Sequence, residues 1–125
     1  MKRDEFIKAV QKKLDLDSKD DAIWITDTIL KTLSERLTEQ EAFDLASQLP
    51  RELKELVKGV PDHVIKMDRE EFISKVAERL DIPKDEAERY VKATFAVLKS
   101  AVTPGEIEDV LSQLPKDLAA LLAEA

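Results

Sequence analysis

The sequence of 125 residues contains no cysteine, only one histidine and only two glycines. Without cysteine the chain has no disulfide bond, no catalytic thiol and no cysteine-ligated zinc. Two glycines do not make the glycine-rich loop that holds a phosphate group. A di-iron bundle needs Glu-x-x-His on two helices, which a single histidine does not supply. Composition alone therefore excludes several of the commonest catalytic and metal sites.

Aromatic residues and long apolar runs are also scarce. Aromatic residues make up 5% of the chain and hydrophobic residues 43%, so a core must be built mostly from leucine, isoleucine, valine and alanine. No apolar run approaches the ~20 residues of a membrane-spanning helix. The N-terminal residues are too charged for a signal peptide. We therefore expect a soluble, cytoplasmic protein that does not associate with membranes.

Positive charge is in deficit. The chain has 20 Lys and Arg against 27 Asp and Glu, which gives a net charge of −7. Nucleic acids bind to positively charged surfaces, so this balance argues against a nucleic-acid partner and against anionic membranes. It leaves basic proteins as possible partners.

Strand signals are missing, and helical periodicity fills the chain. Phe6, Ile7, Val10 and Leu14 recur at the spacing of one helix face. Similar apolar stripes follow along the chain, separated by capping residues or proline. The first two helices are expected over 4–14 and about 19–36. The pattern predicts an all-α protein with eight helices.

The second half of the chain repeats the first. The passage Leu33–Val57 returns as Leu98–Leu122, and an earlier match aligns Phe6 with Phe72. An internal repeat of this length indicates two copies of one structural unit. We expect one domain (1–125) of two tandem four-helix repeats, 1–60 and 68–125, related by a pseudo-twofold axis and joined by an ordered linker, 61–67.

Capping motifs occur at equivalent places in the two copies. Thr38 and Glu41 form one Thr-x-x-Glu box, and Thr103 and Glu106 form another. In such a box the threonine hydroxyl accepts from the third helical N–H, and the glutamate accepts from the N–H of the threonine. We therefore expect both glutamates to return to their caps, and paired carboxylates such as Glu39 and Glu41 to be solvated.

Two motifs resemble a known family. Phe-Ile-x-x-Val stands near the start of each copy, and residues 37–50 read Leu-Thr-x-x-Glu-Ala-x-Asp-Leu-Ala-x-Gln-Leu-Pro. The chain is similar to the bacterial family catalogued as domain of unknown function 2267, and the Gln-Leu-Pro corners at 48–50 and 113–115 are the most specific part of the match. The second copy departs from the motif, for example with Ile107 in place of Ala42. The resemblance implies an all-helical bacterial protein of unassigned function and supplies no catalytic residues.

Two places have a superficial likeness to functional sites. Asp15-x-Asp17 resembles the start of a calcium loop, but the later positions of the loop lack the required Asp or Asn, Gly and Glu. Carboxylates at a helix start are explained by the helix dipole. His63 stands in a Pro-Asp-His sequence with no nearby serine or second histidine to complete a catalytic arrangement. We predict no catalytic residue, no metal site and no cofactor.

Trp24 is the residue that helix periodicity explains least. Its equivalent in the second copy is Arg89, so the repeated fold itself does not require an aromatic side chain there. Large aromatic side chains are mostly buried, which favours packing between the two copies. The alternative is an exposed anchor for a partner, since tryptophan is enriched at binding hot spots.

The leading interpretation is a non-enzymatic protein-interaction or adaptor module with an unidentified protein partner. The alternative is a small-ligand binding protein with an apolar cleft between the two repeats, and an enzyme ranks third. The first expects an exposed apolar patch, and the second expects an enclosed pocket with a few convergent polar groups. The sequence leaves this choice and the oligomeric state open.

Overall fold

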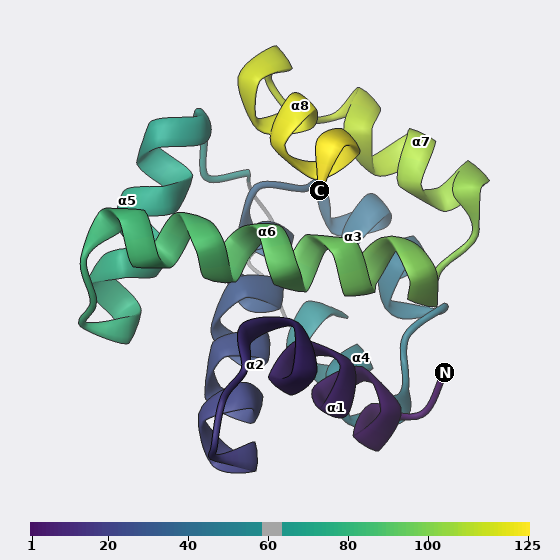
Figure 1. The fold of residues 1–125 in the computed structure, drawn as a ribbon. Helices are drawn as coiled ribbons and strands as arrows, with labels where there is room; N and C mark the ends of the chain where they lie inside the picture. Colours follow the sequence, from purple (N-terminus) through teal and green to yellow (C-terminus); the bar gives the residue numbers. More distant parts are fainter. Residues whose placement is uncertain (59–63) are drawn as a thin grey trace.

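The computed structural model describes residues 1–58 and 64–125, and within these ranges it contains eight helices and no strand (Figure 1). This confirms the all-α fold class. His63 and Gly59 lie outside the described residues. The helices are α1 (Arg3–Leu14), α2 (Lys19–Glu35), α3 (Glu39–Ala46), α4 (Arg51–Lys58), α5 (Arg69–Leu80), α6 (Lys84–Ala101), α7 (Pro104–Ser112) and α8 (Lys116–Glu124). None of these helices is both long and apolar enough to cross a membrane.

Local capping sets where several helices begin. Ser18 Oγ accepts from the backbone N–H of Asp21 at 3.2 Å at the start of α2. At α5, Asp68 and Glu71 form a complete capping box, with distances of 2.8 and 3.2 Å. Pro104 is the first residue of α7, where the missing N–H of proline has no helical partner to lose. The start of α2 at Lys19 agrees with the range of about 19–36 expected from the sequence.

Two aspartates end the first helix of each half. Asp15 and Asp81 follow α1 and α5 with φ values of 53° and 56°. Aspartate is one of the few residues that enter this left-handed region at modest cost. Asp15 therefore has a structural role as the residue that ends α1, and its likeness to the start of a calcium loop needs no metal to explain it.

The helix contacts interlock the two halves. Helix α1 packs against α2 and also against α6, while α5 packs against α6 and also against α2. Within each half, α3 contacts α4 as α7 contacts α8, and α2 contacts α4 as α6 contacts α8. Figure 1 shows the long helix α6 running across the molecule between the helices of both halves. The halves thus use one contact scheme, and the superposition of Phe6 on Phe72 remains a prediction.

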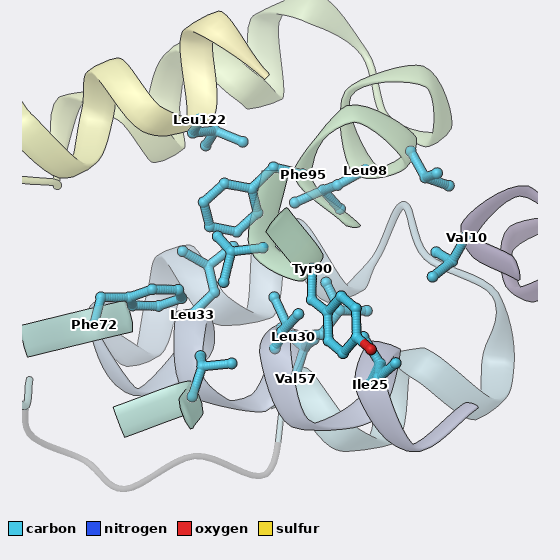
Figure 2. Packing of buried hydrophobic residues seen from close by; sticks show 14 of the residues in the cluster. Val10, Ile25, Leu30, Leu33, Val57, Phe72, Tyr90, Phe95, Leu98 and Leu122 are labelled. Atoms are coloured by element: carbon cyan, nitrogen blue, oxygen red, sulfur yellow. The ribbon is translucent and has the colours of Figure 1, made fainter. Parts of the chain in front are cut away.

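One hydrophobic cluster contains buried residues from every helix. Near its centre, the rings of Phe72 and Phe95 lie 5.7 Å apart at an angle of 44°. Figure 2 shows Phe95 close to Leu33 and Leu122, so side chains from α2, α6 and α8 meet there. Burying a large apolar side chain stabilises a fold by roughly 1.5–3 kcal/mol. Because both halves share this core, most of that stabilisation depends on their contact.

Polar contacts fasten the end of α2 to the second half. Arg79 donates to both carboxylate oxygens of the nearly buried Glu35, at 2.5 and 3.1 Å, and to Thr32 Oγ1 at 2.8 Å. The Glu35 carbonyl also accepts from the N–H of Ile65 at 2.8 Å, which holds the described part of the linker. The residue equivalent to Arg79 in the first copy is Lys13, and the residue equivalent to Glu35 in the second copy is Ser100. The repeat therefore contains this ion pair only once.

Candidate functional site

Trp24 lies on the surface of α2 with 51% of the residue exposed. The favoured expectation that it is buried between the copies is therefore wrong. The reason is its position on the helix, because Ala22 and Leu33 face the core and Trp24 lies on the opposite face of α2. A helix turns by about 100° per residue, so Trp24 is rotated about 160° from Ala22 and about 180° from Leu33.

Beside Trp24 lies a small hollow of about 170 Å³ at the boundary of the two halves. Its lining is mostly apolar and comes from both halves: Leu16, Asp21, Trp24, Ile25, Leu80, Ile82 and Tyr90. Leu16 and Ile82 occupy equivalent positions in the repeat, as do Ile25 and Tyr90. Figure 2 shows Tyr90 beside Ile25. The hollow thus lies between the copies, with Trp24 and the exposed Asp21 at its edge.

The charge at this hollow is mainly negative. The Tyr90 hydroxyl donates to Glu86 Oε1 at 2.6 Å, and this hydrogen bond, together with burial, raises the pKa of Tyr90. The negative charges of Glu86 and Asp21 also raise this pKa, while Arg89 lowers it. The Arg89 guanidinium lies 5.2 Å from the centre of the Tyr90 ring, a cation–π distance. The hydroxyl of Tyr90 therefore stays protonated, and its proton is engaged in the hydrogen bond to Glu86. The nearby charges are the carboxylates of Glu86 and Asp21 and the guanidinium of Arg89.

Exposed aromatic side chains occur only in the first copy among the described residues. Phe43 is 55% exposed on α3, and the position equivalent to it is Glu108. Trp24 stands in the same relation to Arg89. Phe43 lies at a wider depression of about 650 Å³ whose other lining residues are polar or charged. Of the two aromatics, only Trp24 adjoins an apolar hollow.

In each Thr-x-x-Glu box, the structure contains the predicted hydrogen bond to the threonine hydroxyl but not the predicted one to the glutamate side chain. Thr38 Oγ1 accepts from the N–H of Glu41 at 3.2 Å, as predicted. The N–H of Thr38, however, donates to Gln113 Oε1 of the other half at 3.0 Å and not to Glu41. The side chain of Glu41 is instead turned inward, and only 7% of the residue is exposed. The expectation that Glu41 is solvated is wrong.

The same exchange occurs at the second box. Thr103 Oγ1 accepts from the N–H of Glu106 at 3.3 Å, while the N–H of Thr103 donates to Gln48 Oε1 at 2.8 Å. Gln48 Nε2 also donates to Thr103 Oγ1 at 3.2 Å. We call the hydrogen bonds of Gln113 to Thr38 and of Gln48 to Thr103 the crossed caps. They give each Gln-Leu-Pro corner a role in capping a helix of the other half.

The displaced glutamates meet where α3 contacts α7. Burial, a hydrogen bond with Glu106 and the charge of Glu106 raise the pKa of Glu41 to about 8, and Asp109 and Asp44 add smaller effects in the same direction. Glu106 is also only 7% exposed. When two carboxyl groups share one site, repulsion keeps one of them protonated.

The family described as "Uncharacterized conserved protein (DUF2267)" matches residues 3–121. The chain belongs to the DUF2267 family. This confirms the resemblance drawn from the motifs. A comparison with curated proteins found no match. Because the family is described as uncharacterized, membership assigns no activity to this DUF2267 protein.

The carboxyl pair of this DUF2267 protein does not extend to a metal centre. Within residues 1–58 and 64–125, no three histidine, aspartate or glutamate side chains are placed to hold a metal ion. The sequence did carry a signal for the pair, since both copies have Thr-x-x-Glu followed by Gln-Leu-Pro. Local reading, however, assigns each glutamate to its own cap. Only the contact between α3 and α7 shows that the two glutamates meet each other instead.

Proposed function

We propose that this protein is a non-enzymatic interaction module that binds a protein partner through Trp24 and the apolar hollow beside it. The observation that carries the proposal is a half-exposed tryptophan next to an apolar hollow. Each Å² of apolar surface that a partner covers would contribute about 25 cal/mol. Tryptophan is also among the residues most enriched at binding hot spots.

The charges around the hollow define the chemistry of the partner. Asp21 lines the hollow and Glu86 adjoins it through Tyr90, and the whole chain carries a net charge of −7. Complementary charge increases the rate of association and excludes partners of like charge. The partner segment is therefore one apolar side chain flanked by basic residues.

A small ligand in the same hollow is the second candidate function. It is favoured by the position of the hollow between the two copies. Its volume of about 170 Å³ is below the ~300–1,000 Å³ of ordinary small-molecule sites. The hydroxyl of Tyr90 is also already bonded to Glu86, so it is not free to orient a ligand. One side chain of a protein partner fits this geometry better.

The test is affinity capture from cells of the source organism with three tagged forms: the unaltered protein, Trp24→Ala and Phe43→Ala. Phe43→Ala is the matched control because it removes the other half-exposed aromatic side chain. We expect one protein to be captured by the unaltered form and by Phe43→Ala and to be lost with Trp24→Ala. Direct calorimetry should then show affinity for that protein reduced roughly 30-fold, as for a hot spot of about 2 kcal/mol.

Two outcomes would contradict the proposal. Undiminished capture by Trp24→Ala would show that the partner binds elsewhere. Native mass spectrometry of the purified protein that detects a bound small molecule, lost with Trp24→Ala, would favour the second candidate function.

A further inference from the structure

We propose that Glu41 and Glu106 form a buried proton-binding site, in which one shared proton holds α3 against α7 and loss of this proton loosens the contact. The site is separate from the hollow beside Trp24. Its ligand is the proton, and its effect is conformational.

The geometry of the pair supports a shared proton. The two glutamates come from equivalent positions on two helices that contact each other, and each residue is only 7% exposed. Each has one buried oxygen, Oε1, that receives no hydrogen bond within the described residues. Two ionised carboxylates there would repel each other in a medium of low dielectric constant. A proton between them converts this repulsion into a short, strong O–H···O⁻ hydrogen bond.

The charges that act on Glu41 are all negative. They are those of Glu106 and Asp109 on α7 and of Asp44 on α3 itself. Helix α4 packs against α3 and α8 packs against α7, but their basic side chains are not among the groups that shift the pKa of Glu41: Arg51, Lys54, Lys58 and Lys116. Lys58 pairs with Glu55 at 3.2 Å. Among the described residues no side-chain cation acts on Glu41, which leaves a proton to neutralise the pair.

The direction of the pH effect follows from the raised pKa. The pKa of Glu41 rises from an ordinary 4.5 to about 8 in the folded protein, so the folded state binds this proton more tightly than the unfolded state. Its contribution to stability is complete below pH 4.5, declines as the pH rises, and is lost above pH 8. This interval includes neutral pH.

Once the proton is lost, the polar contacts that remain between the two helices are weak, and the apolar core is the main force that holds them together. The crossed caps are hydrogen bonds at exposed positions, where water competes. Helices α3 and α7 are short, with 8 and 9 residues, and short helices depend on tertiary contacts for their stability. Their separation would uncover the buried residues Ala42, Leu45, Ile107 and Val110.

The first test is a ¹³C NMR titration of the glutamate carboxyl groups of the whole protein from pH 3 to pH 10. We expect one glutamate to titrate near pH 8, and this transition to be absent in Glu41→Gln and in Glu106→Gln. Glu39→Gln and Glu108→Gln are matched controls, because they remove the same group from exposed positions of the same helices, and they should keep the transition. If every glutamate of the unaltered protein titrates below pH 6, the proposal is wrong. The titration of the unaltered protein tests the proposal even if a variant fails to fold.

The second test is amide hydrogen exchange at pH 6.5 and pH 9, corrected for the intrinsic exchange rate. We expect protection in α3 and α7 to fall about tenfold or more at pH 9, with a smaller change in α1 and α5. Glu41→Gln should keep its protection at pH 9, because the neutral amide donates to Glu106 without a titrating proton. Equal protection of α3 and α7 at both pH values in the unaltered protein would overturn the proposal.

Discussion

The two halves of this protein meet in two different ways. Where α3 contacts α7, equivalent residues face each other: glutamate with glutamate, and glutamine with threonine in both directions. At the hollow beside Trp24, the first copy has an exposed tryptophan at the position where the second has arginine. Figure 1 shows α3 and α7 side by side, away from the first turns of α2.

The difference separates residues whose contacts lie within the fold from an exposed residue, Trp24, whose placement the fold does not require. The glutamines and threonines between α3 and α7 are hydrogen-bonded to each other within the chain, and the two buried glutamates act on each other. Trp24 has half of its surface exposed, and the second copy has an exposed arginine at the equivalent position. A residue that departs from the repeat and remains exposed is better explained by a partner outside the chain. The experiments below test this contrast, from the largest expected effect to the smallest.

Separating the halves should have the largest effect. A fragment of residues 1–62 loses the contacts of α1 with α6 and of α2 with α5, and so short a chain buries too little surface to be stable alone. We expect no cooperative thermal transition by circular dichroism. A monomeric fragment with a cooperative transition at high temperature would show that the halves do not depend on each other.

Arg79→Ala should be the most damaging of the polar substitutions. It leaves Glu35 nearly buried without its cation, which should lower the free energy of unfolding by about 2–3 kcal/mol. The matched control is Lys13→Ala at the equivalent, exposed position, where we expect a change within about 0.5 kcal/mol. Urea denaturation measures both, and similar values for the two variants would contradict the one-sided role of this ion pair.

Removing the crossed caps should have intermediate and matching effects. Gln48→Ala and Gln113→Ala each leave the N–H of one threonine without its acceptor. Each should lower the free energy of unfolding by about 0.5–1.5 kcal/mol. Urea denaturation of the two single variants tests whether the two copies contribute alike. If only one of the two variants has a lower free energy of unfolding, the two crossed caps do not contribute equally to stability.

Trp24→Ala should have a small effect on stability. Because half of the side chain is exposed, we expect a loss of at most about 1 kcal/mol, well below the ~3–5 kcal/mol for a buried aromatic residue. Phe95→Ala, at a fully buried position, should show the larger value. Unfolding followed by circular dichroism compares the two, since Trp24→Ala removes the only tryptophan. A loss near that of Phe95→Ala would show that Trp24 serves the fold.

Calcium and zinc should have no effect on stability. The calcium-like sequence after Asp15 lacks the required later ligands, and the carboxyl pair of Glu41 and Glu106 offers two groups and no third within the described residues. The melting temperature should therefore be the same with either ion as with a chelator. A metal-dependent rise of several degrees would show that the folded protein binds the ion and would contradict this prediction.

The sequence by itself determined the helices and most of their ends. The all-α fold, the start of α2 at about residue 19 and the hydroxyl caps of Thr38 and Thr103 were all predicted, because periodicity and capping act within one or two helical turns. The Gln-Leu-Pro corners likewise pointed to the family that the comparison confirms. Such features depend on neighbours along the chain.

Only the tertiary structure decided where Glu41 and Glu106 lie and what surrounds Trp24. Each of these glutamates would have closed its own capping box, but a glutamine from the other half supplies the acceptor, across 75 residues at Thr38 and 55 at Thr103. The glutamates then turn into the contact between α3 and α7, where burial and a like neighbour change their chemistry. Helix periodicity by itself places Trp24 on the face of α2 opposite Leu33, but it does not show that Leu80, Ile82 and Tyr90 of the other half lie beside it. A local pattern does not contain this information, because it concerns pairs of residues that only folding brings together.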